Sequence, residues 1–255
     1  VTATHESNKL PLDGGDLHIA NVNGLVIGHS AQITLGGITT EFQVLGTGQP
    51  DSAIGVARFS ADAEEPYFFF AKARGAAIGT YTQASANDGL GSIYWTPSNA
   101  TNFNTAVAQL GVYAEGAHGS ATDMGTYFIF STTPDGSATS SERLRITGSG
   151  AVLIGVTTNA NTTQGVTINQ GAADDEILSL KSSDVAHGMT TVTETDTFAY
   201  FTKYVGANGG LLIDCFDDTG TEAAAIYGTA VSANTTHTAA GVALIEARGY
   251  IKSGT

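Results

Sequence analysis

The sequence contains a single cysteine, Cys215, among its 255 residues. One thiol cannot form an intramolecular disulfide, so the fold must be held by packing or by assembly rather than by a covalent framework. No Cys and His residues stand at the spacing of a zinc site. The longest apolar runs also fall well short of the ~18 residues of a membrane helix. We therefore expect neither a disulfide scaffold nor membrane insertion.

Charged residues are scarce as well, at 13% of the chain against a usual ~25%. Only 10 residues are Lys or Arg and 24 are Asp or Glu, which gives a net charge of −14. A nucleic-acid partner needs a surplus of basic side chains to neutralise its phosphates. We therefore expect no nucleic-acid partner.

Motifs of catalysis and cofactor binding are lacking too. The segment GHSAQ, residues 28–32, has no second glycine to complete a Gly-x-Ser-x-Gly nucleophile motif. Carboxylates adjacent in a strand point to opposite faces and are poorly placed for paired acid–base work. The acidic segment DCFDDTGTE, residues 214–222, does not have the spacing of a calcium-binding loop. We predict no catalytic residues, no cofactor and no metal.

Glycine is abundant instead, with 32 residues, and threonine, alanine, serine and asparagine are common. An apolar content of 42% is too high for a disordered chain. Many glycines and threonines with few Glu and Lys favour short strands joined by tight turns over helices. Residues 104–117 contain a helical spacing at Val107 and Leu110, but Gly111 argues against a helix there. We predict an all-β fold of β-sandwich-like or β-solenoid-like modules.

The two halves of the chain share an order of segments that indicates an internal repeat. The first half has LVIGHS (25–30), EFQVLGTGQPD (41–51) and ARFSAD (57–62), and the second has VLIGVT (152–157), GVTINQGAAD (165–174) and SLKSSD (179–184). Aromatic runs at PYFFFAKARG (66–75) and GTYFIFSTTPDG (125–136) are further predicted strands. We expect a first β module over 1–62, a central β domain over 63–147 and a second β module over 148–255. We read the chain, from Val1 to the final KSGT, as a segment of a longer polypeptide.

The stretch SSERLRITGSGAVLIGVTT, residues 140–158, resembles the ERMRI-SSG-VGIGT signature of tail-fibre and tail-spike proteins of tailed bacteriophages. The preceding FIFSTTPDGSATSSERLRI (128–146), the segment FFFAKARGAAIGTYTQASANDGLGSIYW (68–95) and the segment from 179 to 204 are similar to the same family. The resemblance implies a homotrimeric β-rich fibre whose chains are stacked or intertwined. It implies an extracellular location, in the tail or another surface appendage of a virion. Its partners would be further copies of itself, other tail or capsid proteins, and a host-surface glycan or protein receptor.

The predicted strands LVI (25–27) and VLI (152–154) are apolar at every position. Such strands favour burial on both sides. In a trimer, one side can face its own chain and the other the three-fold axis. Short strands with tight turns also leave open edges, which assembly would cover. We therefore predict that six residues lie at the trimer axis: Leu25, Val26, Ile27, Val152, Leu153 and Ile154.

Four functions are compatible with these observations. The first is a non-catalytic tail fibre for host attachment. The second is a tail spike that degrades polysaccharide, which would need carboxylates converging on a groove. The third is a fibre carried on the capsid, and the fourth is a cellular adhesin module.

Overall fold

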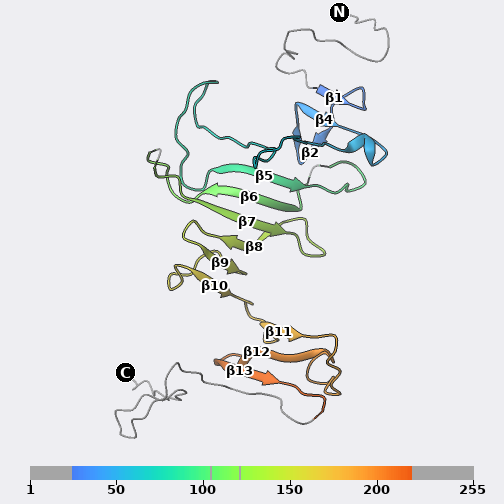
Figure 1. Cartoon of the computed structure of the whole chain (residues 1–255), viewed down its shortest axis with the longest axis vertical. Helices are drawn as coiled ribbons and strands as arrows, with labels where there is room; N and C mark the ends of the chain where they lie inside the picture. The colour runs from blue at the N-terminus through green and yellow to red at the C-terminus, as the bar shows by residue number, and fades with distance from the viewer. Residues whose placement is uncertain (1–24, 104, 121, 220–255) are drawn as a thin grey trace, which may run out of the picture. The chain divides into compact units, whose positions relative to one another are not determined.

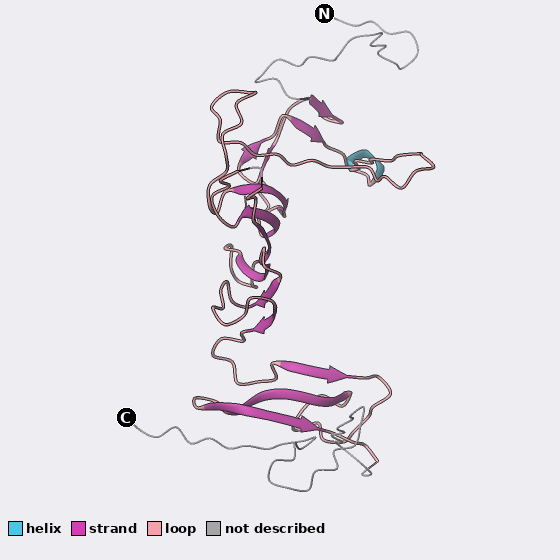
Figure 2. Cartoon of the chain, turned by 60° about the vertical axis from the view of Figure 1, so that its left-hand side comes forward, coloured by secondary structure: helices cyan, strands magenta, loops and turns pink. Residues whose placement is uncertain are grey.

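A computed structural model describes residues 25–103, 105–120 and 122–219 of the chain (Figure 1). These residues form 13 β-strands and one short 3-10 helix, η1 (Pro50–Ser52), as the strand and helix colours of Figure 2 show. The prediction of an all-β fold is confirmed. No helix in the described ranges is long and apolar enough to cross a bilayer. Residues 1–24 and 220–255, which belong to the first and third predicted modules, lie outside the described residues.

The chain divides into two compact units, one ending at Asn169 and the other beginning at Gln170. The larger sheet of the first unit has six strands in the order β10-β9-β8-β7-β6-β5. These strands are β5 (Gly89–Trp95), β6 (Ala108–Ala114), β7 (Thr126–Thr132), β8 (Ser141–Ile146), β9 (Ala151–Ile154) and β10 (Gly165–Ile168). Neighbours from β5 to β9 are antiparallel, and β9 and β10 are parallel. The predicted module boundary at 147/148 falls inside this sheet, between the paired strands β8 and β9.

Two smaller sheets precede the larger one. β1 (Leu25–Ile27) pairs in parallel with β4 (Phe42–Val44). Between them, β2 (Thr34–Leu35) and β3 (Ile38–Thr39) form a hairpin. The turn has two glycines in the left-handed region, Gly36 and Gly37, with φ of 60° and 82°, which a side chain would disfavour.

The first two segments of each predicted repeat form equivalent parallel pairs, β1 with β4 and β9 with β10. The third segments differ, because residues 57–62 contain no strand whereas residues 179–184 overlap β11. Each pair begins with a strand that ends in a left-handed glycine, Gly28 or Gly155. A Cβ at Gly28 would lie 2.0 Å from the carbonyl oxygen of Leu45, and a Cβ at Gly155 would lie 2.1 Å from that of Asn169. The two pairs therefore require glycine at the same place for the same reason.

The crossing segment between the parallel strands is held from the second strand in both copies. In the first copy, the Gln43 side-chain amide donates to the Ile33 carbonyl (2.7 Å) and accepts from the Ile33 amide (2.9 Å). At the equivalent place in the second copy, the Thr167 hydroxyl accepts from the Asn159 side chain (2.9 Å). Each copy thus consists of a strand, a crossing segment and a second strand parallel to the first.

Two predicted strands do not form. Residues 57–62 and 66–75 lie within 53–88, where the described chain contains no strand. Their sequences fit strands, but a strand is stable only when its backbone groups have a neighbouring strand to pair with. Among the described residues, neither segment has such a neighbouring strand.

The second unit contains an antiparallel sheet in the order β11-β12-β13. Its strands are β11 (Leu178–Lys181), β12 (Thr197–Val205) and β13 (Gly209–Cys215). In the segment that joins β11 to β12, His187 is 1% exposed and stacks on Phe216, with ring centroids 5.1 Å apart. Its Nε2 donates to the Thr197 carbonyl (2.7 Å) and its Nδ1 accepts from the Met189 amide (3.2 Å). This buried histidine has a hydrogen-bond partner on each ring nitrogen and belongs to the core of the unit.

Candidate self-association surface

The six-stranded sheet presents one face made of two rows of side chains, each row taking one residue from every strand. Strand register sets the rows, because residues directly opposite each other in paired strands lie on the same face. We call these two rows together the apolar face. The first row is Ile93, Leu110, Phe130, Leu144, Ile154 and Ile168, and the second is Gly91, Val112, Phe128, Ile146, Val152 and Val166.

The apolar face is open to solvent over much of its length. Seven of its larger side chains are at least one third exposed: Ile93, Phe128, Phe130, Ile146, Ile154, Val166 and Ile168. Val166 on β10, at the end of the second row, is 64% exposed. Figure 1 shows the strands lying side by side from β5 to β10, and the rows cross all of them. A continuous apolar surface of this kind is typical of an interaction site.

The opposite face of the sheet is covered by its own side chains. Ile129 and Leu153 are 8% and 2% exposed. Tyr127 stacks on Tyr113, with ring centroids 5.6 Å apart, and the Arg145 guanidinium lies 4.2 Å above the Tyr127 ring. Burial raises the pKa of the Tyr127 hydroxyl. Apart from Tyr94 on the edge strand, which is 56% exposed, this face has its packing within the chain, so among the described residues the apolar face is the one left largely uncovered.

Polar groups on this opposite face satisfy one another. Arg145 donates to both carboxylate oxygens of Glu142, at 2.8 Å each, and this hydrogen-bonded pair raises the pKa of the Arg145 guanidinium. The side-chain nitrogen of Gln109 donates to the hydroxyls of Ser92 and Tyr113 at 2.8 and 2.7 Å. Because these polar groups already have hydrogen-bond partners within the chain, they do not need a second protein to satisfy them.

The predicted axis residues divide between the two faces. In β9, Val152 and Ile154 belong to the apolar face, whereas Leu153 points to the opposite face and is buried in its own chain. In β1, Leu25 and Ile27 are 36% and 48% exposed, on the face that they share with Phe42 and Val44 of β4. Val26 lies on the other side of β1, opposite the buried Gln43. The alternation of strand faces thus separates residues that are adjacent in sequence, and placement at a trimer axis stays a prediction.

The second unit has a comparable but smaller surface. One face of its sheet carries the rows Leu178, Phe201 and Ile213, and Leu180, Ala199 and Cys215. Ile213 is 53% exposed, while Ala199 is 8% exposed. Lys203 lies on the same face and forms an ion pair with Asp174.

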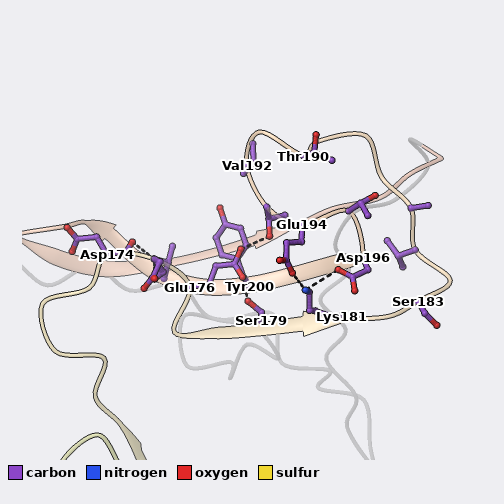
Figure 3. Close-up of a pocket in the computed structure, with 16 residues that line it drawn as sticks. Asp174, Glu176, Ser179, Lys181, Ser183, Thr190, Val192, Glu194, Asp196 and Tyr200 are labelled. Carbon is purple, nitrogen blue, oxygen red and sulfur yellow. Dashed lines mark hydrogen bonds and ion pairs between the residues drawn. The ribbon is translucent and has the colours of Figure 1, made fainter. Parts of the chain in front are cut away.

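The other face of this second sheet borders a polar pocket (Figure 3). Lys181 forms ion pairs there with Glu194 and with Asp196, the latter at 3.1 Å. Glu176 accepts hydrogen bonds from the hydroxyls of Ser179 and Thr193. In the described part of the chain, no group of three His, Cys, Asp or Glu side chains is arranged to hold a metal ion. Glu176, Glu194 and Asp196 of the pocket are thus engaged by a cation or by hydroxyl groups.

Four strands of the six-stranded sheet, β7 to β10, were predicted from the sequence, but the apolar face was not. Ile93 of β5 and Leu110 of β6 were missed, because GLGSIYW is rich in glycine and residues 104–117 were judged by a helical spacing instead of by the alternation in AQLGVYA. The signal for the face is long-range register, which a single sequence does not contain.

No family model and no curated protein matches the sequence. Among solved structures, the chain is similar to the carboxy-terminal domain of the bacteriophage T5 L-shaped tail fibre, with 17% identity and a TM-score of 0.34 over 40% of this chain and 36% of that one. It is also similar to the same domain with its intramolecular chaperone domain, with 13% identity and a TM-score of 0.38 over 71% of this chain and 70% of that one. Both TM-scores are too low to establish a common fold.

Proposed function

We propose that this chain is a structural component of a bacteriophage tail fibre, located in the virion, and that its copies associate as a homotrimer through the apolar face. The observation that carries the proposal is the apolar face itself, which crosses all six strands from β5 to β10. Because each row takes one residue from every strand, the apolar face extends from one edge strand of the sheet to the other. Copies placed side by side about a common axis could therefore share this surface over its whole length.

Burial of the apolar face would contribute substantially to association. Complete burial of a large aliphatic or aromatic side chain contributes about 1.5–3 kcal/mol. The exposed residues of the apolar face are mostly about half covered already, so each would contribute about 1 kcal/mol on association. The seven exposed side chains would together contribute about 7 kcal/mol per copy, which is of the same order as the cost of association. The number three comes from the resemblance of residues 140–158 to the fibre signature, not from the geometry of one chain.

The proposed role is host attachment, with a glycan or protein on the host surface as the receptor and with tail or capsid proteins as the neighbours in the particle. The test is protein mass spectrometry of purified virions, combined with competition by the recombinant chain for adsorption to host cells. We expect the chain in the particles and a dose-dependent loss of adsorption. Absence from virions, with the chain found on a cell surface, would favour a cellular adhesin instead.

A polysaccharide-degrading tail spike is the second candidate, and the pocket of the second unit favours it. Carboxylates of Asp174, Glu176, Glu194 and Asp196 border this pocket, and glycoside hydrolysis uses pairs of carboxyl groups. Incubation with host capsular polysaccharide separates the two functions. A non-catalytic fibre releases no oligosaccharide, whereas release that is abolished by Glu176→Gln would make the chain an enzyme.

A further inference from the structure

Residues 66–75, PYFFFAKARG, form a segment whose aromatic side chains are exposed to solvent, and we call it the aromatic arm. Tyr67, Phe68, Phe69 and Phe70 are 49%, 70%, 85% and 60% exposed. The arm belongs to the described residues 53–88, which contain no strand. Four consecutive aromatic side chains in water are costly unless something covers them.

The arm is anchored at its C-terminal end. Arg74 donates to both carboxylate oxygens of Asp88, at 2.7 Å each, and the Arg74 amide donates to the Thr82 carbonyl at 3.0 Å. Asp88 immediately precedes β5, so the C-terminal end of the arm is held beside the sheet.

Phe70 places the arm on the apolar face. Gly91 is the one position in the second row without a side chain, and a Cβ built there would lie 2.5 Å from the Cβ of Phe70. Phe70 therefore occupies the place that Gly91 leaves empty. A groove of about 450 Å³ separates the arm from the sheet and is lined by Phe68, Phe69, Phe70, Leu110, Val112 and Phe128, among others. Phe69 remains 85% exposed although it borders this groove, so its own sheet covers little of it.

The second unit contains the same pattern in a covered state. TFAYFTKYVG, residues 197–206, matches the arm with Phe, Lys and Gly at the same places and with aromatic residues opposite Tyr67 and Phe69. There the segment forms β12, the middle strand of its sheet. Ala199 and Tyr200, which match Phe68 and Phe69, are each 8% exposed, whereas Phe198, which matches Tyr67, is 39% exposed. The protein thus buries two of these positions where neighbouring strands are available. Among the described residues of the first unit the arm has no neighbouring strand, and β5 is the edge strand of the six-stranded sheet.

We infer that Tyr67, Phe68 and Phe69 of one copy pack onto the apolar face of a second copy, so that the arm interlocks neighbouring chains. The inference rests on the proposed self-association. If copies meet through the apolar face, the arm lies inside the contact, because Phe70 already fixes it there. Phe68, Phe69 and Phe70 all line the groove, yet each keeps most of its surface exposed, and this exposed surface is left for the neighbour. The arm adds no acidic group to an acidic chain, and its Arg74 is already paired with Asp88.

A photo-crosslinking experiment tests the inference on the full chain. A benzophenone amino acid replaces Phe69, and equal amounts of light and isotopically heavy chains are refolded together and irradiated. We expect crosslinks between heavy and light chains that map to β5–β8. A matched control carries the same group at Tyr94, which is 56% exposed but lies on the opposite face of β5, and it should give no such crosslinks.

Crosslinks confined to chains of one isotope, or heavy–light crosslinks outside the apolar face, would overturn the inference. A trimer mass by light scattering in that sample would leave the proposed function standing, whereas a monomer mass would count against both. As a second measurement, Phe69→Ser should raise the concentration at which the oligomer dissociates by about tenfold or more, and Tyr94→Ser should leave it unchanged. Equal effects of the two substitutions would also overturn the inference.

Discussion

Gly28 and Gly155 occupy the same position in the two copies of the repeat, and both combine a positive φ with a close backbone approach. The conformation disfavours any side chain, and the carbonyl oxygen leaves no room for a Cβ. Their equivalence supports a duplication more strongly than the sequence did, because the two glycines share a backbone conformation and a close contact and not only a residue type.

Gly155→Ala should therefore destabilise the chain more than a glycine substitution that costs conformation alone. Gly171 is the matched control, because its φ is 69° but nothing lies within 4 Å of a Cβ built there. We expect about 1 kcal/mol for Gly171→Ala and about 3 kcal/mol for Gly155→Ala, measured as the free energy of unfolding in urea. Equal losses in the free energy of unfolding would show that the close approach to Asn169 does not contribute to the requirement for glycine at position 155.

The ion pair at the root of the arm predicts a pH effect. The Arg74 guanidinium, and secondly the Ser85 amide, hold the pKa of the Asp88 carboxyl well below its usual range. Because that pKa is lowered in the folded state, the pair stabilises the fold above the ordinary carboxyl pKa of about 4. This contribution is lost as the pH falls towards the pKa of the folded state.

An NMR titration of the Asp88 carboxyl measures this directly. Arg74→Gln should move the midpoint up towards the ordinary value. Lys72→Gln should move it little, since the Lys72 charge is the weakest of the causes. A wild-type midpoint near the ordinary value would contradict the assignment of the pair.

At the scale of elements, the sequence predicted those strands that carry their own signal. ERLRITG alternates and VLIG ends in a glycine, and both became strands, β8 and β9. The Gly148–Gly150 turn joins them as expected, with Gly150 at a φ of 94°. Residues 104–117, with a weak helical spacing, contain the strand β6 because β5 and β7 pair with it on both sides.

The remainder depended on partners that local sequence does not specify. The aromatic arm has the sequence of a strand but no neighbouring strand in the part of the chain that the structure describes. The apolar face required the register of Ile93 with Leu110 and of Leu110 with Phe130, which sets which residues of six strands share a side. Long-range pairing of this kind is outside the reach of periodicity.

Substitution on the apolar face should separate association from folding. Ile154→Asp with Ile168→Asp places charges in the first row, at the end formed by β9 and β10. Since both side chains are over one third exposed, each strand should still form, and far-UV circular dichroism should be unchanged while the sedimentation coefficient falls to that of a monomer. Gln109→Asp on the opposite face provides the contrast and should stay assembled. Assembly that survives the double substitution would exclude the apolar face as the contact.

For the whole molecule, the balance of forces predicts an unusual salt response. Each copy carries a net charge of −14, so copies repel one another at low ionic strength, whereas the attraction comes from apolar burial. Sedimentation velocity should show the oligomer strengthened, or at least retained, as NaCl rises to about 1 M, where screening is nearly complete. Dissociation by salt would mean that ion pairs, rather than the apolar face, hold the copies together.

The most direct test of shared apolar faces is the molar mass of the full-length chain in solution, determined by light scattering after size exclusion. The account predicts a single species at three times the 26.0 kDa of one chain, stable on dilution. A well-folded species at the mass of one chain, with the apolar face accessible to a hydrophobic dye, would contradict it.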